Sequence, residues 1–499
     1  MSFCVTVCSR EGETVLQAEK GQLISDLLKA AGMVAVFPCG GNGKCGRCRV
    51  QAQGLLEEPT STELEMLGDD YAKGIRLACM CRVTGDCRIV LSASDIEAVT
   101  QGYFPVYEKK PLYARCGAAV DIGTTTIAAQ LWVGDEMVAE ASALNPQATF
   151  GADVISRIEA ALAGRLGELQ QTVASAIEKM LTAMGEKAGC YPEVAVITGN
   201  TAMLHFLAGE DPAPLSAAPF AARRLFGEWL SADAVKIGGK LGDTRFYLAP
   251  CFSAFVGGDI ATAILASELV KKQQTALLVD IGTNGEMALL KGWKLICCST
   301  AAGPVFEGAQ ISCGMQGKAG AIDHVTVEDG QLRCTTIKNE KAAGICGSGL
   351  VDAVAALVQL ELVEESGYME DDVELAEGVT LTPQDIRMVQ LAKGAICAGI
   401  RTLCDAAKID AEDITTLYIA GGFGAKLDIA SAAAIGMIPE ELACKARVIG
   451  NAALAGAAML LRSEPLAEQC NRFIREAEII ELSSNPTFSS HYMDAMMFC

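Results

Sequence analysis

Hydrophobic and polar residues alternate near the start of the chain, as they do in strands with one buried face. The alternation over 3–8 predicts one strand, and 14–17, which follows a turn, predicts the returning strand of a hairpin. Apolar residues then recur at helical spacing over 22–31, and 87–91 alternates again. These segments predict a small domain, over residues 1–92, in which a sheet packs against one helix.

A longer apolar pattern occurs twice in the rest of the chain. In each copy an apolar strand runs into Asp-Ile-Gly-Thr and a second strand follows, over 118–129 and again over 276–289. A third apolar strand, within 417–424, ends in a Gly-Gly turn, and 451–461 has the composition of a buried helix. The pattern therefore predicts an α/β unit over 116–499 that is built from two similar lobes.

The spacing of the repeat sets the boundaries of these lobes. The first is predicted at about 116–272 plus 450–499, and the second at about 273–449. Residues 93–115 lack a clear periodicity and are predicted to be a linker. A tether of about twenty residues allows a small domain to move relative to a larger one.

Composition narrows the class of protein. The chain has 499 residues, of which 51% are hydrophobic and 20% charged, so we expect about two to four domains with large cores. A net charge of −21 disfavours nucleic acid as a partner, because phosphate binding needs clustered Lys and Arg. No apolar run reaches the roughly 18–20 residues of a membrane span, and the N-terminus does not have the pattern of a signal peptide. We expect a cytoplasmic protein that binds no membrane.

The chain contains 21 cysteines, most of them scattered singly, which is not the framework of a disulfide-bonded domain. So many free thiols suit a reducing, anaerobic cell. Cys39, Cys45 and Cys48 are the exception, because they lie close together in a glycine-rich loop, and Cys79 follows as a fourth thiol. Four thiolates so arranged suit a [2Fe–2S] cluster. A zinc site is the weaker alternative, because Cys79 and Cys81 are only one residue apart and fit one tetrahedral ion poorly.

The two Asp-Ile-Gly-Thr hairpins have the chemistry of a phosphate site. Glycine allows the backbone to approach a phosphate closely, threonine hydroxyls and amides donate to its oxygens, and the aspartate can hold hydrated Mg²⁺. The candidate ligands of phosphate and Mg²⁺ are Asp121, Gly123, Thr124, Thr125, Asp280, Gly282, Thr283 and Asn284. The candidate adenosine site is the turn at Gly421, Gly422 and Phe423. Asp259 and Glu286 are candidates for the carboxylate that polarises water, although Asp259 could instead cap the helix that follows it.

These motifs also carry resemblances to known families. Residues 1–92 resemble a β-grasp [2Fe–2S] ferredoxin domain, whose Arg-Leu-Ala-Cys pattern implies Cys79, rather than Cys81, as the fourth ligand. The order of two phosphate hairpins and an adenosine turn is that of the actin, sugar-kinase and Hsp70 superfamily, with its two-lobed, ribonuclease H-like ATPase fold. The whole chain resembles the ATP-dependent reductive activators of corrinoid proteins. Further segments that carry this resemblance lie at 145–158, 197–205, 301–308, 311–315 and 344–350.

The resemblance implies a function. One electron would pass from the cluster to Co(II) of a corrinoid protein in a methyltransferase system and restore Co(I), with ATP as cofactor and a low-potential electron donor as a second partner. It also implies a possible homodimer through the ATPase domain. Ser312 could be a partner-facing hydroxyl, although an ordinary turn role fits it better, and His205 fits a core histidine.

Three other functions are compatible with parts of the chain. An activator of acyl-CoA dehydratases would hold its cluster between two subunits, through cysteines such as Cys313 or Cys346. A redox-gated, ATP-binding regulatory protein would use the cluster as a sensor. A small-molecule kinase would leave the ferredoxin-like domain unexplained.

Overall fold

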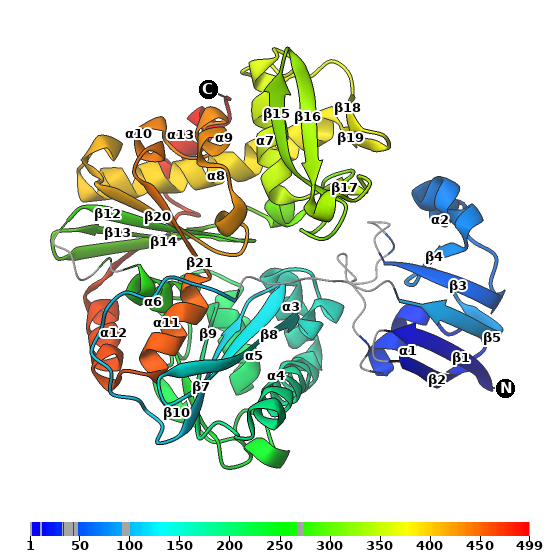
Figure 1. The fold of residues 1–499 in the computed structure, drawn as a ribbon, viewed down its shortest axis with the longest axis horizontal. Helices are drawn as coiled ribbons and strands as arrows, with labels where there is room; N and C mark the ends of the chain where they lie inside the picture. The colour runs from blue at the N-terminus through cyan, green and yellow to red at the C-terminus, as the bar shows by residue number, and fades with distance from the viewer. Residues whose placement is uncertain are drawn as a thin grey trace.

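The structure is a computed structural model that describes residues 2–9, 12–31, 33, 43, 48–91, 100–267, 269 and 274–498. Figure 1 shows a small N-terminal domain beside a larger body of two lobes. None of the helices in the described ranges is both long and apolar enough to span a bilayer.

The N-terminal domain is a five-stranded sheet, in the order β2-β1-β5-β3-β4, with α1 packed on it. Its elements are β1 (Ser2–Ser9), β2 (Gly12–Glu19), α1 (Ile24–Ala30), β3 (Arg49–Leu56), α2 (Ser61–Leu67), β4 (Ile75–Leu77) and β5 (Val83–Val90). The first strand pairs with β2 antiparallel and with β5 parallel, which joins the two ends of the domain's sequence. Alternate residues of β5 are buried, as its pattern predicts.

The first lobe is built on a six-stranded sheet in the order β10-β11-β9-β6-β7-β8. Its strands are β6 (Cys116–Ile122), β7 (Thr126–Val133), β8 (Glu136–Leu144), β9 (Val194–Gly199), β10 (Glu228–Leu230) and β11 (Arg245–Leu248). Its helices are α3 (Val154–Ala160), α4 (Leu166–Ala188), α5 (Thr201–Ala208) and α6 (Gly258–Ala266). The hairpin β6–β7 contains the first Asp-Ile-Gly-Thr motif in its turn.

The second lobe repeats this plan with the sheet β21-β20-β12-β13-β14-β22. Its strands are β12 (Ala276–Ile281), β13 (Gly285–Lys291), β14 (Lys294–Thr300), β20 (Thr416–Ala420), β21 (Ala446–Gly450) and β22 (Glu478–Ile480). Its helices are α7 (Gly347–Gln359), α8 (Pro383–Ala407), α9 (Ile429–Ala434), α10 (Glu440–Ala443) and α13 (Pro486–Asp494). Smaller sheets are formed by β15 (Ala321–Glu328), β16 (Gln331–Thr336) and β17 (Gly344–Ile345), and by β18 (Val373–Ala376) and β19 (Val379–Leu381).

Helices α6 and α11 (Ala452–Leu461) lie between the two large sheets. Their apolar side chains share one core with residues of both sheets. The outer face of the first lobe's sheet is covered by α4 and α5, and that of the second lobe's sheet by α7 and α8. Gly456 allows α11 to approach α6 closely, because a Cβ there would lie 1.9 Å from the Thr262 carbonyl oxygen. The layered arrangement brings the ends of β6 and β12 to the same side of the molecule.

The end of the chain lies in a different lobe from the one predicted. The pattern assigned all of 450–499 to the first lobe, and α11 does pack there, next to α12 (Glu464–Glu476). However, β22 pairs parallel with β14, and α13 packs on α8 of the second lobe. The Phe498 side chain is buried over Lys393 of α8, which gives this short terminal segment a core to join.

Residues 100–115 of the predicted linker lie along the two-lobed body. The amide of Tyr103 donates to the Ile449 carbonyl at 3.1 Å, and the amide of Leu112 donates to the Leu461 carbonyl at 2.9 Å. Gly102 forms a bridge with Gly450, and the Phe104 ring contacts Trp132 edge-on. This part of the predicted linker is therefore attached along its length, and the rest of it, residues 93–99, lies outside the described residues.

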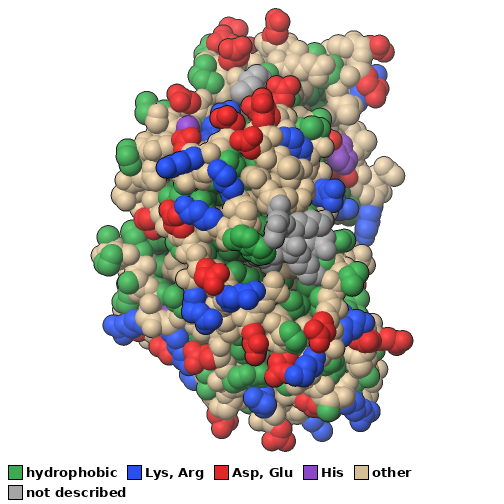
Figure 2. Space-filling view, turned by 90° about the vertical axis from the view of Figure 1, so that its left-hand side faces the viewer, with side chains coloured by type: hydrophobic (Ala, Val, Ile, Leu, Met, Phe, Trp, Pro, Cys, Tyr) green, Lys and Arg blue, Asp and Glu red, His purple; other side chains and the backbone are tan. Residues whose placement is uncertain are grey.

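On the face shown in Figure 2, acidic and basic side chains are interspersed over both lobes. The face carries no continuous basic stripe of the kind that tracks a phosphate backbone.

Candidate functional site

Two of the four predicted cluster ligands lie within the described residues, and they face each other. Cys48 precedes β3 and Cys79 follows β4, so pairing of these strands brings the cysteines together. The two sulfur atoms are 3.1 Å apart, and the Cys79 amide donates to the Cys48 sulfur at 3.5 Å. The hydrogen bond from Cys48 lowers the pKa of the Cys79 thiol to about 7. Cys39 and Cys45 lie outside the described residues.

Cys81 is placed differently from Cys79. Its side chain is fully buried in the domain core, where burial raises the pKa of the thiol to about 12. Cys48 and Cys79 are less enclosed, at 5% and 8% exposure. The geometry thus favours Cys79 over Cys81 as the partner of Cys48, and the donor set of soft thiolates suits an iron–sulfur cluster.

A buried ion pair supports the segment that carries Cys79. Glu63 of α2 is fully buried and accepts hydrogen bonds from Arg76 Nε at 2.9 Å and Arg76 Nη2 at 3.0 Å. The same carboxylate accepts the Leu77 amide at 2.9 Å. Sequence reasoning missed this pair, because Glu63 lies in a polar stretch that resembles an exposed loop.

In the two-lobed body, the two Asp-Ile-Gly-Thr turns meet at the ends of β6 and β12. Three helices also begin here: Asn200 caps α5, Asp259 lies in the first turn of α6, and Asn451 caps α11. Asn451 Nδ2 donates to Asp121 Oδ2 at 3.1 Å, and Asn200 Nδ2 donates to Glu286 Oε1 at 3.3 Å. Helix N-termini carry partial positive charge and therefore favour anions such as phosphate.

Four predicted site residues form one group of interacting carboxylates. Burial and the neighbouring charge of Asp259 raise the pKa of Asp121 to about 7, and burial with Asp259 and Asp121 raises the pKa of Asp280 to about 8. Burial raises the pKa of Asp259 to about 6, and burial with Asp259 and Asp280 raises the pKa of Glu286 well above its usual value. A cation placed among them would relieve this repulsion.

Asp259 is not the cap of α6, because Gly257 holds the N-cap position and Asp259 lies in the first turn; its role as the water-polarising carboxylate stays a prediction. Its Oδ1 accepts the Ile260 amide at 2.8 Å in the first turn of α6, and its side chain also shares a hydrogen bond with Glu286. Glu286 is 6% exposed and belongs to β13, so its carboxylate is held from both lobes. Within the described ranges, no three His, Cys, Asp or Glu residues are arranged as a direct metal-ligand set. Mg²⁺ commonly keeps several of its waters and needs few direct ligands.

The threonines of the two hairpins converge on a residue that sequence reasoning did not select. Thr283 Oγ1 donates to Glu307 Oε1 at 2.6 Å, and Thr125 Oγ1 donates to Glu307 Oε2. Glu307 lies in the short 3-10 helix Pro304–Glu307 that follows β14. Glu307 lies in the segment 301–308 that carries the family resemblance, but its own role could not be predicted, because it depends on contacts made across the lobes.

The remaining hairpin residues hold the backbone of the turns. The Gly123 carbonyl accepts Asn145 Nδ2 at 2.8 Å, and the Thr124 carbonyl accepts Arg157 Nη2 at 2.6 Å. In the second turn, the Gly282 amide donates to the Asn284 carbonyl at 3.0 Å.

The predicted adenosine turn lies against the second hairpin. Gly421 has a φ of +93°, and a Cβ there would lie 2.6 Å from Asp280 Oδ1, so this position requires glycine. The Gly421 amide donates to the Gly450 carbonyl at 3.1 Å, whereas a Cβ built on Gly422 would have open space around it. The Phe423 ring stacks on Phe306, with centroids 4.9 Å apart, so one of its faces is covered by the protein.

Two further predicted positions have structural roles. The Ser312 hydroxyl donates to Asp385 Oδ1 at 3.1 Å and its amide donates to the same atom at 2.7 Å, which ties the loop to the start of α8. His205 is fully buried, with Nδ1 within 2.8 Å of the Thr201 carbonyl oxygen. Both positions agree with the ordinary roles that the sequence analysis preferred.

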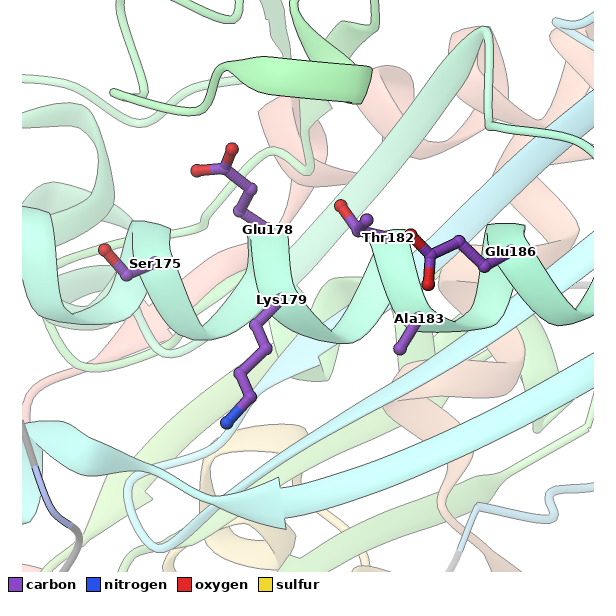
Figure 3. A pocket seen from close by; sticks show the side chains of 6 residues that line it. All are labelled: Ser175, Glu178, Lys179, Thr182, Ala183 and Glu186. Atoms are coloured by element: carbon purple, nitrogen blue, oxygen red, sulfur yellow. The ribbon is translucent and has the colours of Figure 1, made fainter. Parts of the chain in front are cut away.

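A hollow of about 420 Å³ lies along α4, away from the hairpins. Figure 3 shows that its six lining residues all project from this one helix. Ligand sites usually draw converging polar groups from several elements, so the hairpin turns remain the candidate site.

Family models match the N-terminal domain and both parts of the two-lobed body. Residues 6–84 match the 2Fe-2S iron-sulfur cluster binding domain, 116–272 the RACo middle region, and 274–499 the C-terminal domain of RACo, the ASKHA domain. The chain is 29% identical to the corrinoid activation enzyme RamQ of Eubacterium limosum, over 97% of this chain and 98% of the relative. It is also 28% identical to a [Co(II) methylated amine-specific corrinoid protein] reductase of Methanosarcina barkeri, over 51% of each chain.

The chain is homologous to corrinoid reductive activators over nearly its whole length. A solved structure of a reductive activator for a corrinoid, iron-sulfur protein superposes on this chain with a TM-score of 0.70, at 25% identity, over 99% of this chain and 98% of that one. The predicted family and fold class are thereby confirmed. The family models also support a [2Fe–2S] cluster in the N-terminal domain and ATP as the ligand of the ASKHA domain, while Mg²⁺ stays a prediction.

Proposed function

We propose that this chain binds Mg²⁺ and ATP between its two lobes and couples this binding to the transfer of one electron to a corrinoid protein. The observation that carries the proposal is the convergence of both Asp-Ile-Gly-Thr turns, three helix N-termini and the Gly-Gly turn on one group of carboxylates. The phosphate oxygens would accept hydrogen bonds from the threonine hydroxyls and from the amides at the helix N-termini. Asp121 and Asp280 would hold Mg²⁺ through its waters, which lowers the mutual repulsion of the carboxylates.

The further roles follow from the positions of the side chains. Asp259 and Glu286 share a hydrogen bond beside the turns and would orient the water that attacks the terminal phosphate. Gly421, Gly422 and Phe423 would border the adenosine, because their turn lies against the second hairpin and Gly422 leaves open space.

In the N-terminal domain, Cys39, Cys45, Cys48 and Cys79 would bind the [2Fe–2S] cluster. When bound, the cluster supplies one electron at a time. The electron would come from a low-potential donor and reduce Co(II) to Co(I) on the corrinoid partner. Each 59 mV by which this one-electron step is uphill costs a factor of about ten in its equilibrium constant. ATP can offset this cost only by stabilising one state of the complex more than another.

One observation disfavours Cys346 as a ligand in the alternative of a cluster held between two subunits. Cys346 is buried at 6% exposure, and its thiol donates to the Ile322 carbonyl at 3.3 Å. It is therefore not presented to a second subunit.

The proposal is tested by adding the reduced protein to a Co(II) corrinoid protein under anaerobic conditions and following the cobalt absorption spectrum. We expect formation of Co(I) that depends on Mg²⁺ and ATP. Asp280→Asn should lower the ATP-dependent rate, while Glu328→Gln, an exposed acidic position in the same lobe, should not. Absence of ATP-dependent Co(I) formation with intact cluster would contradict the proposal.

A further inference from the structure

The carboxylate of Glu307 connects the two hairpins, and therefore the two lobes. It accepts a hydrogen bond from Thr125 of the first lobe, 182 positions away in the sequence, and from Thr283 of the second lobe, 24 positions away. Glu307 is held in place by its neighbour Phe306, whose ring stacks on Phe423 of the Gly-Gly turn. A single side chain thus joins both candidate phosphate turns beside the candidate adenosine turn.

We propose that Glu307 competes with the phosphates of the nucleotide for the hydroxyls of Thr125 and Thr283, so that phosphate binding requires displacement of its carboxylate. This inference rests on the ATP site proposed above. It assigns to Glu307 the role of a residue that sets nucleotide affinity and links it to the contact between the lobes.

The competition follows from the number of protons available. A threonine hydroxyl has one proton to donate, and ionised carboxylates and phosphates are acceptors only. A hydroxyl that donates to phosphate therefore cannot also donate to Glu307. Two negative groups in the same place also repel each other, and this repulsion is stronger in a partly buried site than in water. Because Glu307 takes both hydroxyls at once, its displacement frees one donor in each lobe together.

A buried cation lies next to these turns and could balance the incoming charge. Arg157 is fully buried, and its guanidinium donates to the Thr124 carbonyl at 2.6 Å and the Gly151 carbonyl at 2.9 Å. It forms no ion pair within the described part of the chain. Burial lowers the pKa of Arg157 to about 10, and the charges of Asp153 and Glu307 oppose this shift. A phosphate that displaces Glu307 would supply the negative charge that Arg157 loses.

The test uses the full-length protein with its cluster, and measures binding of Mg²⁺ and ATP by equilibrium dialysis. Glu307→Gln keeps the shape of the side chain and removes the charge, so we expect about tenfold tighter ATP binding, or ~1.4 kcal/mol. Glu307→Asp keeps the charge but is one methylene shorter, so it cannot keep both hydrogen bonds and should tighten binding by a smaller factor. Glu328→Gln, which removes an exposed charge from the same lobe, should leave ATP affinity unchanged.

Adenosine provides a second readout, because it lacks phosphate and should bind the wild type and Glu307→Gln equally. Unchanged or weaker ATP binding by Glu307→Gln, with a wild type that binds ATP, would overturn the competition and leave the proposed ATP site intact. An equal gain in adenosine affinity would also overturn it, because the effect would then not depend on phosphate. If neither the wild type nor any variant binds ATP, the proposed function fails and this inference fails with it.

Discussion

The ion pair between Glu63 and Arg76 should determine the stability of the cluster-binding domain. Glu63→Ala would leave the Arg76 guanidinium, which is 7% exposed, buried without its carboxylate, and would also remove the acceptor of the Leu77 amide. Breaking a buried pair from one side costs about 3–5 kcal/mol. Small domains are stable by only about 5–15 kcal/mol, so this is a large share of the total.

The loss can be measured by urea titration under anaerobic conditions, with the visible absorption of the cluster as the probe of this domain. With a slope of about 1–3 kcal/mol per molar urea, the transition midpoint should fall by about 2 M. Glu65→Ala is the matched control, because Glu65 is exposed on the same helix and should change stability by less than about 0.5 kcal/mol.

A double replacement separates the pair from the general effect of mutation. The variant in which Glu63 and Arg76 are both Leu removes both charges, so it should be less destabilised than the sum of the two single variants. The reasoning would be refuted if Glu63→Ala melted at the same urea concentration as Glu65→Ala. Such a result would mean that the buried pair contributes nothing net to the fold around Cys79.

Three further predictions follow from the site and its surroundings. Cys79→Ser should lose the cluster absorption, whereas Cys81→Ser should keep it, because the Cys79 sulfur is the one that faces Cys48. Glu286→Gln should raise the melting temperature in Mg²⁺-free buffer by an amount that grows with pH. Because the fold raises the pKa of Glu286, the contribution of this residue to folding stability is fully present below about pH 4.5 and is lost as pH rises. Gly102→Val should cost about 1–3 kcal/mol and speed amide exchange over 101–103, because the new Cβ would lie 2.5 Å from the Asn451 carbonyl oxygen.

Each of these has a clear contrary result. Loss of the cluster in Cys81→Ser but not in Cys79→Ser would mean that Cys81, and not Cys79, is the fourth cluster ligand. A melting-temperature difference for Glu286→Gln that is the same at pH 5 and pH 8 would mean that its pKa is not raised by the fold. Unchanged exchange in Gly102→Val would show that the linker is not held by its contact with α11.

The attached part of the linker is of interest because of the residues that it contacts. The Asn451 amide donates to the Gln101 carbonyl at 3.1 Å, and the side chain of Asn451 donates to Asp121 in the first hairpin. The chain that leads to the cluster domain therefore begins beside the candidate nucleotide site.

Much of the fold was determined by local patterns in the sequence. The alternation in β5, the repeated strand–turn–strand motif and the Gly-Gly turn predicted the domains and the order of the hairpins, because these depend on neighbours within a few residues. The candidate ligands Asp121, Asp280, Asp259 and Glu286 were found in the same way, and the structure brings their carboxylates into one group.

Other features were decided only by the tertiary structure. Nothing in the sequence assigned a role to Glu63, Glu307 or Arg157 individually, and they gain their roles from contacts with groups 13, 182 and 33 positions away. The end of the chain likewise has too short a pattern to specify its lobe, and the available core of α8 decided it. Hydrophobic periodicity reports which face of an element is buried, whereas the partner of a buried charge depends on which elements the fold places next to it.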